Sequence, residues 1–151
     1  MLDQILIAGQ RWWIDRVYRT AERSGKLARP KHLLIGERGE REALFHLRKV
    51  GYTVVARRWT SPKVRGDIDL IAWESDWLCF IEVKTRSERN VLDPAETAVD
   101  REKQKRVKNL ARAYLRGFPE QGRRNISVRF DVISVYLEGT LPVFEVFRGA
   151  F

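Results

Sequence analysis

Two apolar runs that carry acidic side chains constrain the fold of this chain more than any other feature. They occupy residues 67–73 (DIDLIAW) and 77–85 (WLCFIEVKT), and the polar residues 74–76 (ESD) separate them. Runs of this length and composition, joined by residues that favour a tight turn, are typical of a β-hairpin. Strict alternation along the first strand would place Ile68 and Leu70 on the same face of the sheet.

The length of the turn decides which residues face each other across the hairpin. With a loop of two or four residues, the numbers of facing residues sum to 151, whereas a three-residue loop breaks this register. On this register Asp69 faces Glu82, and Asp67 faces Lys84. Directly facing residues have Cβ atoms about 4.5–5.5 Å apart. The sequence therefore predicts two carboxylates side by side on apolar strands.

Two interpretations of these carboxylates follow from the residues alone. Adjacent carboxylates repel each other and need a counter-charge, which a hard divalent cation such as Mg²⁺ supplies through oxygen ligands. In the alternative, this face is a solvated edge where Lys84 pairs with Asp67 and Glu82 faces water. The apolar surroundings, the lysine on the face of Glu82 and the basic segment that follows favour the metal site, because carboxylates clustered with a lysine are typical of hydrolytic sites.

A first helix is expected over about residues 37–50. Its apolar stripe includes Ala43, Leu44 and Leu47, and Glu40 lies three, four and seven residues before them, which directs it toward the interior. Two explanations fit such a glutamate. It belongs to the carboxylate site, which we favour, or it stabilises the first turn of the helix through the dipole.

A second helix is expected over about residues 95–116, after Pro94. Basic side chains separated by three or four residues form one continuous stripe along it, and Gln104 lies at the edge of the opposite, apolar stripe. Such a helix is suited to lie along a phosphate backbone, and equally to face solvent. The candidate DNA-binding residues are Arg101, Lys105, Lys108, Arg112 and Arg116.

Charge and composition narrow the class of protein. The chain has 29 basic and 20 acidic side chains, and residues 84–124 hold 12 of the basic and 6 of the acidic ones. A basic surface of this kind is typical of a nucleic-acid partner, with an anionic membrane as the second choice. One cysteine excludes an internal disulfide, and two histidines argue against structural zinc. Because no long apolar span or secretory leader is recognisable, we expect a cytoplasmic protein.

The chain divides into an N-terminal extension, residues 1–35, and one domain, residues 36–151. Tryptophans and arginines at helical spacing predict an amphipathic helix in the extension, with its aromatic side packed on the domain; contact with membrane or nucleic acid is the alternative. The residue pattern of the domain predicts a helix, three strands, a second helix and two further strands. The last two strands are expected over residues 127–137 and 143–147. This order predicts an α/β domain with a mixed β-sheet flanked by helices.

Four motifs carry a resemblance to a known family: Gly39-Glu40, residues 66–72 (GDIDLIA), residues 80–86 (FIEVKTR) and residues 129–132 (RFDV). With these motifs the chain resembles the YraN family, also called UPF0102, over about residues 36–151. That family is similar to the restriction-endonuclease-like, or PD-(D/E)xK, nuclease superfamily, and within it to archaeal Holliday junction resolvases. The resemblance implies a restriction-endonuclease-like three-layer core.

The resemblance also implies metal-dependent cleavage of DNA, with Mg²⁺ or Mn²⁺ as the cofactor. Asp69 and Glu82 match metal ligands, Lys84 matches the lysine of the Glu-x-Lys pair, and Glu40 matches an acidic residue of the first helix. Two further candidates are Gln104, which matches a glutamine of some branches, and Asp67, which stands where the family usually has glutamate.

A second class of function stays open, a non-catalytic nucleic-acid-binding protein on the same fold. The intact set of Asp69, Glu82 and Lys84 favours the nuclease, because binding alone does not require all three. We expect DNA as the partner, and a second copy of the chain is a further candidate partner.

Overall fold

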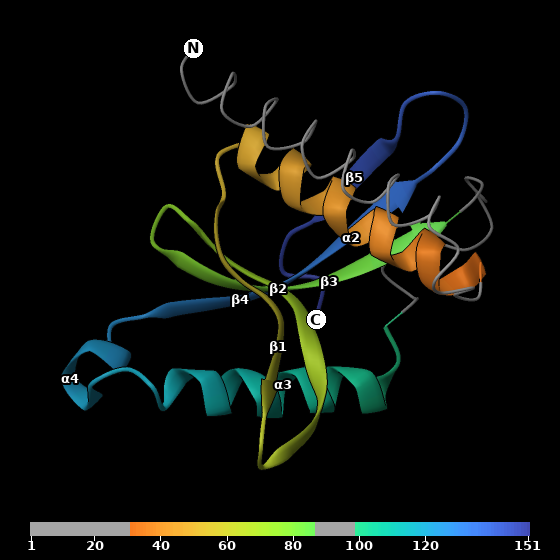
Figure 1. Ribbon diagram of the computed structural model, residues 1–151. Helices are drawn as coiled ribbons and strands as arrows, with labels where there is room; N and C mark the ends of the chain where they lie inside the picture. The colour runs from red at the N-terminus through yellow and green to blue at the C-terminus, as the bar shows by residue number, and fades with distance from the viewer. Residues whose placement is uncertain (1–30, 87–98) are drawn as a thin grey trace, which may run out of the picture.

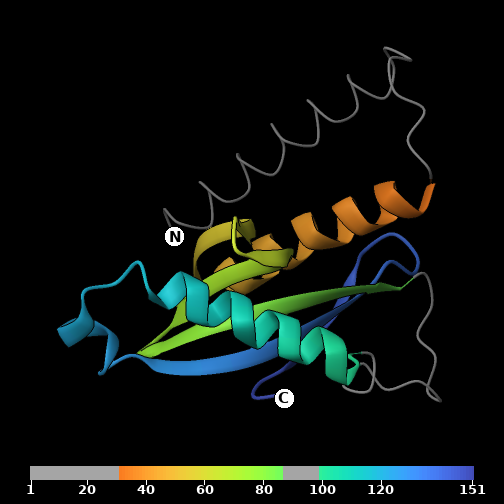
Figure 2. The same ribbon diagram turned by 90° about the horizontal axis from the view of Figure 1, so that it is seen from below.

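The structure, a computed structural model, describes residues 31–86 and 99–151 and arranges them in three layers. Figures 1 and 2 show one sheet between helix α2 (Lys31–Lys49) and helix α3 (Arg101–Leu115), which cover its opposite faces. The strands are β1 (Thr53–Ser61), β2 (Val64–Glu74), β3 (Trp77–Arg86), β4 (Ser127–Tyr136) and β5 (Val143–Phe147). The expected mixed sheet flanked by helices is confirmed.

The strands follow one another across the sheet in chain order, β1-β2-β3-β4-β5. All neighbours are antiparallel except β3 and β4, which run parallel, so that α3 forms the crossover between them. Strands β2 to β5 begin and end within a few residues of their predicted bounds. The short helix α4 (Glu120–Arg123) was not predicted, because four residues give no periodic signal.

The two long helices differ from expectation at their starts. The first helix is already present at Lys31, so it crosses the predicted boundary at residue 35, and most of the predicted extension (residues 1–30) lies outside the described residues. Helix α3 begins after Asp100, whose carboxylate accepts a hydrogen bond of 2.7 Å from the Lys103 N–H. An aspartate N-cap is a stronger start signal than the proline six residues earlier. No helix among the described residues is long and apolar enough to cross a bilayer.

Apolar side chains form one cluster on each face of the sheet. Ala43, Leu44 and Leu47 of α2 pack on β-strand residues such as Leu70. On the other face, Val107, Leu110 and Ala111 of α3 pack on residues such as Phe80. Both helices are therefore fixed by burial, and the side chains that they direct at the sheet are fixed with them.

Strand β2 departs from strict alternation just beside the predicted carboxylates. Ile68 belongs to the α3-side cluster together with Ile71, whereas Leu70 belongs to the α2-side cluster, so the expectation that Ile68 and Leu70 share a face is wrong. The neighbouring backbone is irregular: Arg58 of β1 has φ 43° and Gly66 of β2 has φ 102°. The alternation of faces is therefore interrupted at Asp69, between Ile68 and Leu70.

Two glycines on α2 offer a matched test of helix packing. A Cβ at Gly39 would lie 1.8 Å from the Thr85 Oγ1 of β3, whereas a Cβ at Gly36 would meet nothing within 4 Å. We expect Gly39→Ala to lower the free energy of unfolding by about 1–3 kcal/mol, since the helix must move off the strand. Gly36→Ala should raise it by up to about 1 kcal/mol through helix propensity. Urea unfolding of both variants tests this, and equal effects would contradict the close approach at Gly39.

A candidate metal-binding carboxylate site

The hairpin of β2 and β3 has the predicted register. Its pairs run from Glu74↔Trp77 to Leu70↔Ile81. This ladder ends at Leu70, so Asp69, the adjacent residue, lies just outside it. Beyond that point the Asp69 Oδ2 accepts a hydrogen bond of 2.8 Å from the Val83 N–H. The carboxylate thus satisfies a backbone donor of β3, which ties the Asp69 side chain to the neighbouring strand.

Glu82 is the second carboxylate of the site, and its side chain is only 5% exposed. Its Oε1 lies 2.9 Å from the Lys103 Nζ and 3.6 Å from the Lys84 Nζ. Its Oε2 is buried and has no hydrogen-bond partner within residues 31–86 and 99–151. The alternative in which Glu82 faces water and Lys84 pairs with Asp67 is therefore wrong, because Glu82 is buried and Lys84 lies against it.

The electrostatics of Asp69 show that the two acids interact. Burial, followed by the charge of Glu82, raises the pKa of Asp69 to about 7, although the Val83 hydrogen bond and Lys103 act in the opposite direction. A carboxylate whose ionised form is disfavoured by a neighbouring carboxylate is stabilised by any added cation. The pair has the chemistry of a cation site.

A cavity of about 410 Å³ opens beside the carboxylates, between the first half of α2, the middle of β2 and the second half of β3. Glu40 lines it, and its Oε2 accepts a hydrogen bond of 2.7 Å from the Arg58 Nε. Because Glu40 lies nine residues into the described part of α2, the alternative that it stabilises a first helical turn is wrong. The cavity is lined by His32, Ile35, Gly36, Glu40, Asp69, Glu82, Val83 and Thr85.

The protein itself would supply only part of a metal's coordination shell. Within residues 31–86 and 99–151, no group of three His, Cys, Asp or Glu side chains is arranged to hold an ion. Asp69 and Glu82 contribute oxygen atoms, and the remaining positions would fall to water or to a bound substrate. Such a shell suits Mg²⁺, which usually keeps several waters and binds through one or two carboxylates.

Comparison with known proteins places these residues in a family. Residues 39–135 match the family model described as "Uncharacterised protein family UPF0102". The chain belongs to the UPF0102 family. It is 44% identical to a UPF0102 protein of Koribacter versatilis over 122 residues, which are 81% of this chain and 82% of that protein. It is 41% identical to one of Solibacter usitatus over 138 residues (91% and 99%) and 42% identical to one of Rhodococcus jostii over 121 residues (80% and 98%).

Asp67 and Gln104, the two further candidates from the sequence, have other partners among the described residues. Asp67 pairs with Thr60 of β1 across the ladder, and its charge contributes to raising the pKa of Lys103. The Gln104 amide donates a hydrogen bond of 3.1 Å to the Val99 carbonyl, at the start of α3. Gln104 thus holds the helix start in place, while Asp67 acts on the site through its charge.

Lys103 contacts Glu82 and was not among the candidate residues predicted from the sequence. Burial lowers its pKa, but the charge of Glu82 and a hydrogen bond with it, together with Asp69 and Asp67, raise the net pKa above the ordinary lysine value. Its signal in the sequence is a cation in the first turn of a helix, a position that the helix dipole disfavours.

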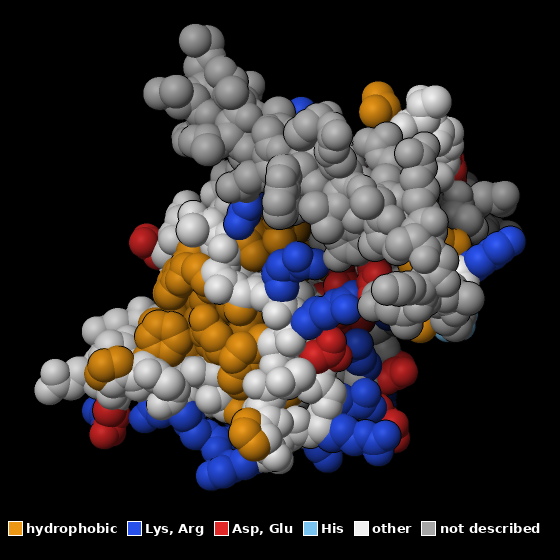
Figure 3. Space-filling view, viewed as in Figure 1, with side chains coloured by type: hydrophobic (Ala, Val, Ile, Leu, Met, Phe, Trp, Pro, Cys, Tyr) orange, Lys and Arg blue, Asp and Glu red, His pale blue; other side chains and the backbone are white. Residues whose placement is uncertain are grey.

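The predicted basic stripe on α3 faces solvent, on the side opposite the residues that pack against the sheet. Basic side chains gather along the edge of the molecule formed by α3 and α4 (Figure 3). Lys108 is an exception within the stripe, because its ammonium lies 5.7 Å and 5.6 Å from the ring centroids of Phe130 and Phe151. It contributes to packing at the chain's C-terminal end in addition to the surface charge.

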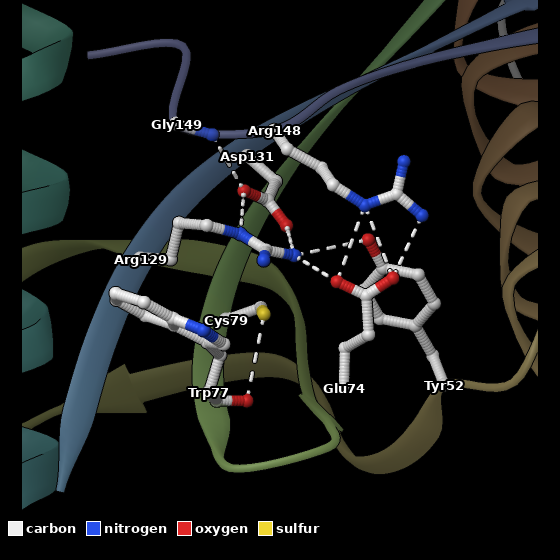
Figure 4. A network of polar contacts seen from close by, with 8 residues as sticks. All are labelled: Tyr52, Glu74, Trp77, Cys79, Arg129, Asp131, Arg148 and Gly149. Carbon is white, nitrogen blue, oxygen red and sulfur yellow. Dashed lines mark hydrogen bonds and ion pairs between the residues drawn. The ribbon is translucent and has the colours of Figure 1, made fainter.

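A second polar network lies at the other end of the hairpin and joins it to β4 and the C-terminal residues (Figure 4). Arg129 donates to both Asp131 oxygens, at 2.7 Å and 2.9 Å, and to Glu74. Arg148 donates to Glu74 as well, at 2.7 Å, and the Gly149 N–H donates to Asp131 at 2.9 Å. The charges of its two acids and two arginines compensate one another, so we interpret this network as one that stabilises the fold.

Glu74 makes this network sensitive to acid. Hydrogen bonds from Arg148 and Arg129 lower the pKa of Glu74 to about 2, against an opposing contribution from burial. A carboxylate with a depressed pKa stabilises the folded protein above its unfolded pKa, and this contribution is lost as the pH falls toward the folded value. Between about pH 5 and about pH 3, we expect the free energy of unfolding of the wild type to fall more steeply than that of Glu74→Gln. Urea unfolding of both proteins at several pH values measures this. Parallel curves would contradict this role.

Proposed function

We propose that this UPF0102 protein is a metal-dependent endonuclease that hydrolyses phosphodiester bonds in DNA, on a restriction-endonuclease-like fold. The observation that carries the proposal is the Glu82 Oε2, a buried carboxylate oxygen without a partner among the described residues, beside a second carboxylate at Asp69. An unsatisfied buried oxygen of a charged group is unfavourable. A cation bound by both carboxylates would remove that penalty and the repulsion between them.

Asp69 and Glu82 are the residues that would hold Mg²⁺ or Mn²⁺. When bound, such an ion polarises a phosphate oxygen and lowers the pKa of a coordinated water. The hydrogen bond from the Val83 N–H keeps the Asp69 carboxylate oriented, and burial keeps competing water away from Glu82. Both features prepare the ligands in advance of the reaction.

Lys84 and Glu40 would act on the substrate side of this site. The Lys84 ammonium, 3.6 Å from the Glu82 Oε1 and partly exposed, is suited to orient the attacking water and to offset the negative charge that develops on the phosphate. Glu40 lines the same cavity and is held by Arg58, so its carboxylate is suited to accept a hydrogen bond from a water there.

One observation favours the second candidate, a nucleic-acid-binding protein without catalysis. The Lys103 Nζ lies 2.9 Å from the Glu82 Oε1, so that the protein already supplies a cation to the carboxylates. A site balanced in this way is stable without a metal ion. DNA would then be held only through its phosphates by the basic surface.

A cleavage panel separates the two candidates. Linear, single-stranded, flapped and four-way DNA are incubated with the protein in Mg²⁺, in Mn²⁺ and in chelator, and a Glu82→Gln protein purified in parallel controls for contaminating nucleases. The nuclease is supported if one substrate is cut with metal by the wild type and not by the variant. Binding of DNA without cleavage under every condition would reject the nuclease in favour of the binding protein.

The basic stripe makes a separate prediction about binding. Because Lys108 also packs on two rings, the test uses Lys105, Arg112 and Arg116, replaced together by alanine. Each lost phosphate contact lowers the slope of log affinity against log salt by about 0.9 on duplex DNA. We expect the triple variant to bind DNA more weakly, with a smaller slope, in fluorescence anisotropy titrations. Lys49→Ala, at the end of α2, is the control, and an unchanged slope in the triple variant would show that DNA does not lie on the stripe.

A further inference from the structure

Lys103 occupies an unusual place for a lysine on a surface helix. Its stem leaves the first turn of α3 on the inner side, and its ammonium reaches the buried Glu82 of β3. The Asp100 carboxylate binds the Lys103 N–H at 2.7 Å, which fixes the backbone from which the side chain departs. The Lys103 side chain is nevertheless 29% exposed, so it also reaches solvent.

Helix stability does not explain this residue. A positive charge in the first turn opposes the helix dipole, whereas an acidic residue there would be favourable. The contact with Glu82 is the feature that offsets this penalty. Lys103 therefore serves the carboxylate site, and its own helix would be more stable without its charge.

The charges of the site show what the lysine does there. With both carboxylates ionised, Asp69 and Glu82 are balanced by Lys84 and Lys103. A divalent cation that enters this balanced site meets two ammonium groups, and its binding is opposed by their charge. A DNA phosphate beside the site would weaken this opposition to metal binding, because it offers one of the lysines another anionic partner.

Building on the endonuclease proposed above, we propose that Lys103 is an exchangeable counter-cation that couples metal loading to DNA binding. Without DNA, Lys103 pairs with Glu82 and weakens the hold of the carboxylates on a divalent ion. When DNA binds, its phosphate takes the Lys103 ammonium, and the freed Glu82 oxygen binds the ion. Lysine suits this role because its charge sits on a flexible four-carbon stem with rotatable donors. Lys103 is a positioning residue in this scheme, since it acts through Glu82.

The coupling is measured with Mn²⁺ as the probe ion. Free Mn²⁺ is followed by electron paramagnetic resonance while the full-length protein is titrated, with and without a saturating DNA duplex. Readings are taken on ice before products appear on a gel. For the wild type we expect DNA to raise the Mn²⁺ affinity by about tenfold, within the usual range of coupling between two sites. By reciprocity, Mn²⁺ should raise the DNA affinity by the same factor.

Three variants isolate the lysine. Lys103→Met keeps the stem and removes the charge, so Mn²⁺ affinity without DNA should rise about tenfold. The increase in Mn²⁺ affinity that DNA causes should become smaller, because only Lys84 is then left to respond to the DNA phosphates. Lys103→Arg keeps the charge and should retain most of the coupling. Lys49→Met removes an exposed charge of α2 far from the cavity and should leave Mn²⁺ affinity unchanged. Thermal unfolding confirms that each variant is folded.

The outcomes separate this inference from the proposed function. If the wild type binds Mn²⁺ in a way that Glu82→Gln abolishes, yet Lys103→Met changes neither the affinity nor the coupling, the role of Lys103 is rejected and the metal site stands. If Lys103→Met binds Mn²⁺ more weakly than the wild type, the role is likewise rejected. If the wild type binds no Mn²⁺ with or without DNA, the metal-dependent nuclease fails, and the coupling fails with it.

Discussion

If the protein is the proposed nuclease, we expect Lys84→Ala to lower the rate of DNA cleavage by about 10²-fold or more, the scale for loss of one preorganised contact to a transition state. The fold should persist, because this side chain ends at the carboxylate site and is 27% exposed. Mn²⁺ affinity should stay the same or rise slightly, since a cation beside Glu82 has been removed. Single-turnover cleavage rates and Mn²⁺ titrations on one substrate measure both quantities.

Asp69→Ala is the matched comparison for that experiment. It removes a proposed metal ligand, and we expect it to lose metal binding and cleavage together, in contrast to Lys84→Ala. Wild-type cleavage by Lys84→Ala would exclude the mechanism that the Glu-x-Lys resemblance implies. Loss of metal binding in Lys84→Ala would instead assign the lysine a structural role in the site.

Arg129→Ala should destabilise the fold by about 3–5 kcal/mol, the penalty for leaving a buried charge without its partner. Asp131 is fully buried, and Arg129 donates to both of its oxygen atoms. After the substitution, only the Gly149 N–H among the contacts of Figure 4 still donates to that carboxylate. Urea unfolding at neutral pH measures the loss.

The control for Arg129 is another arginine in an ion pair. Arg124 pairs with Glu120 at 2.8 Å, but both side chains are mostly exposed, so Arg124→Ala should change stability by at most about 1 kcal/mol. Adding Asp131→Asn to Arg129→Ala should restore part of the lost stability, because it removes the uncompensated charge. Equal effects of the two arginine substitutions would show that burial of Asp131 does not matter.

The register of the hairpin that carries the two carboxylates was predictable from the sequence because its geometry is local. A turn between two alternating runs leaves few registers, and the one derived from the loop length is the one observed, from Glu74↔Trp77 to Leu70↔Ile81. The face on which Ile68 packs was not predictable in this way. It depends on the irregular backbone of the two paired strands near Arg58 and Gly66, which strict alternation does not anticipate.

Contacts between elements that are distant in the sequence could not be predicted either, because they too depend on how the strands and helices pack together. Lys103 joins Glu82 only because β3 and β4 are parallel and α3 crosses the sheet between them. The pairing of Arg58 with Glu40 likewise requires α2 to lie against β1. Local periodicity predicts which face of a helix is apolar, but it carries no information on the side chain that a given lysine meets across the sheet.

The parallel pairing of β3 and β4 also shapes how the chain folds during synthesis. The antiparallel hairpin that carries both carboxylates needs only local contacts, whereas β4 joins β3 after α3 and α4 have been made. Until then β3, with five consecutive residues destined for burial, is an edge strand with unpaired backbone groups. The strand that holds Glu82 is therefore open to wrong strand pairing in a nascent chain, and slower synthesis without chaperones should increase aggregation of this protein.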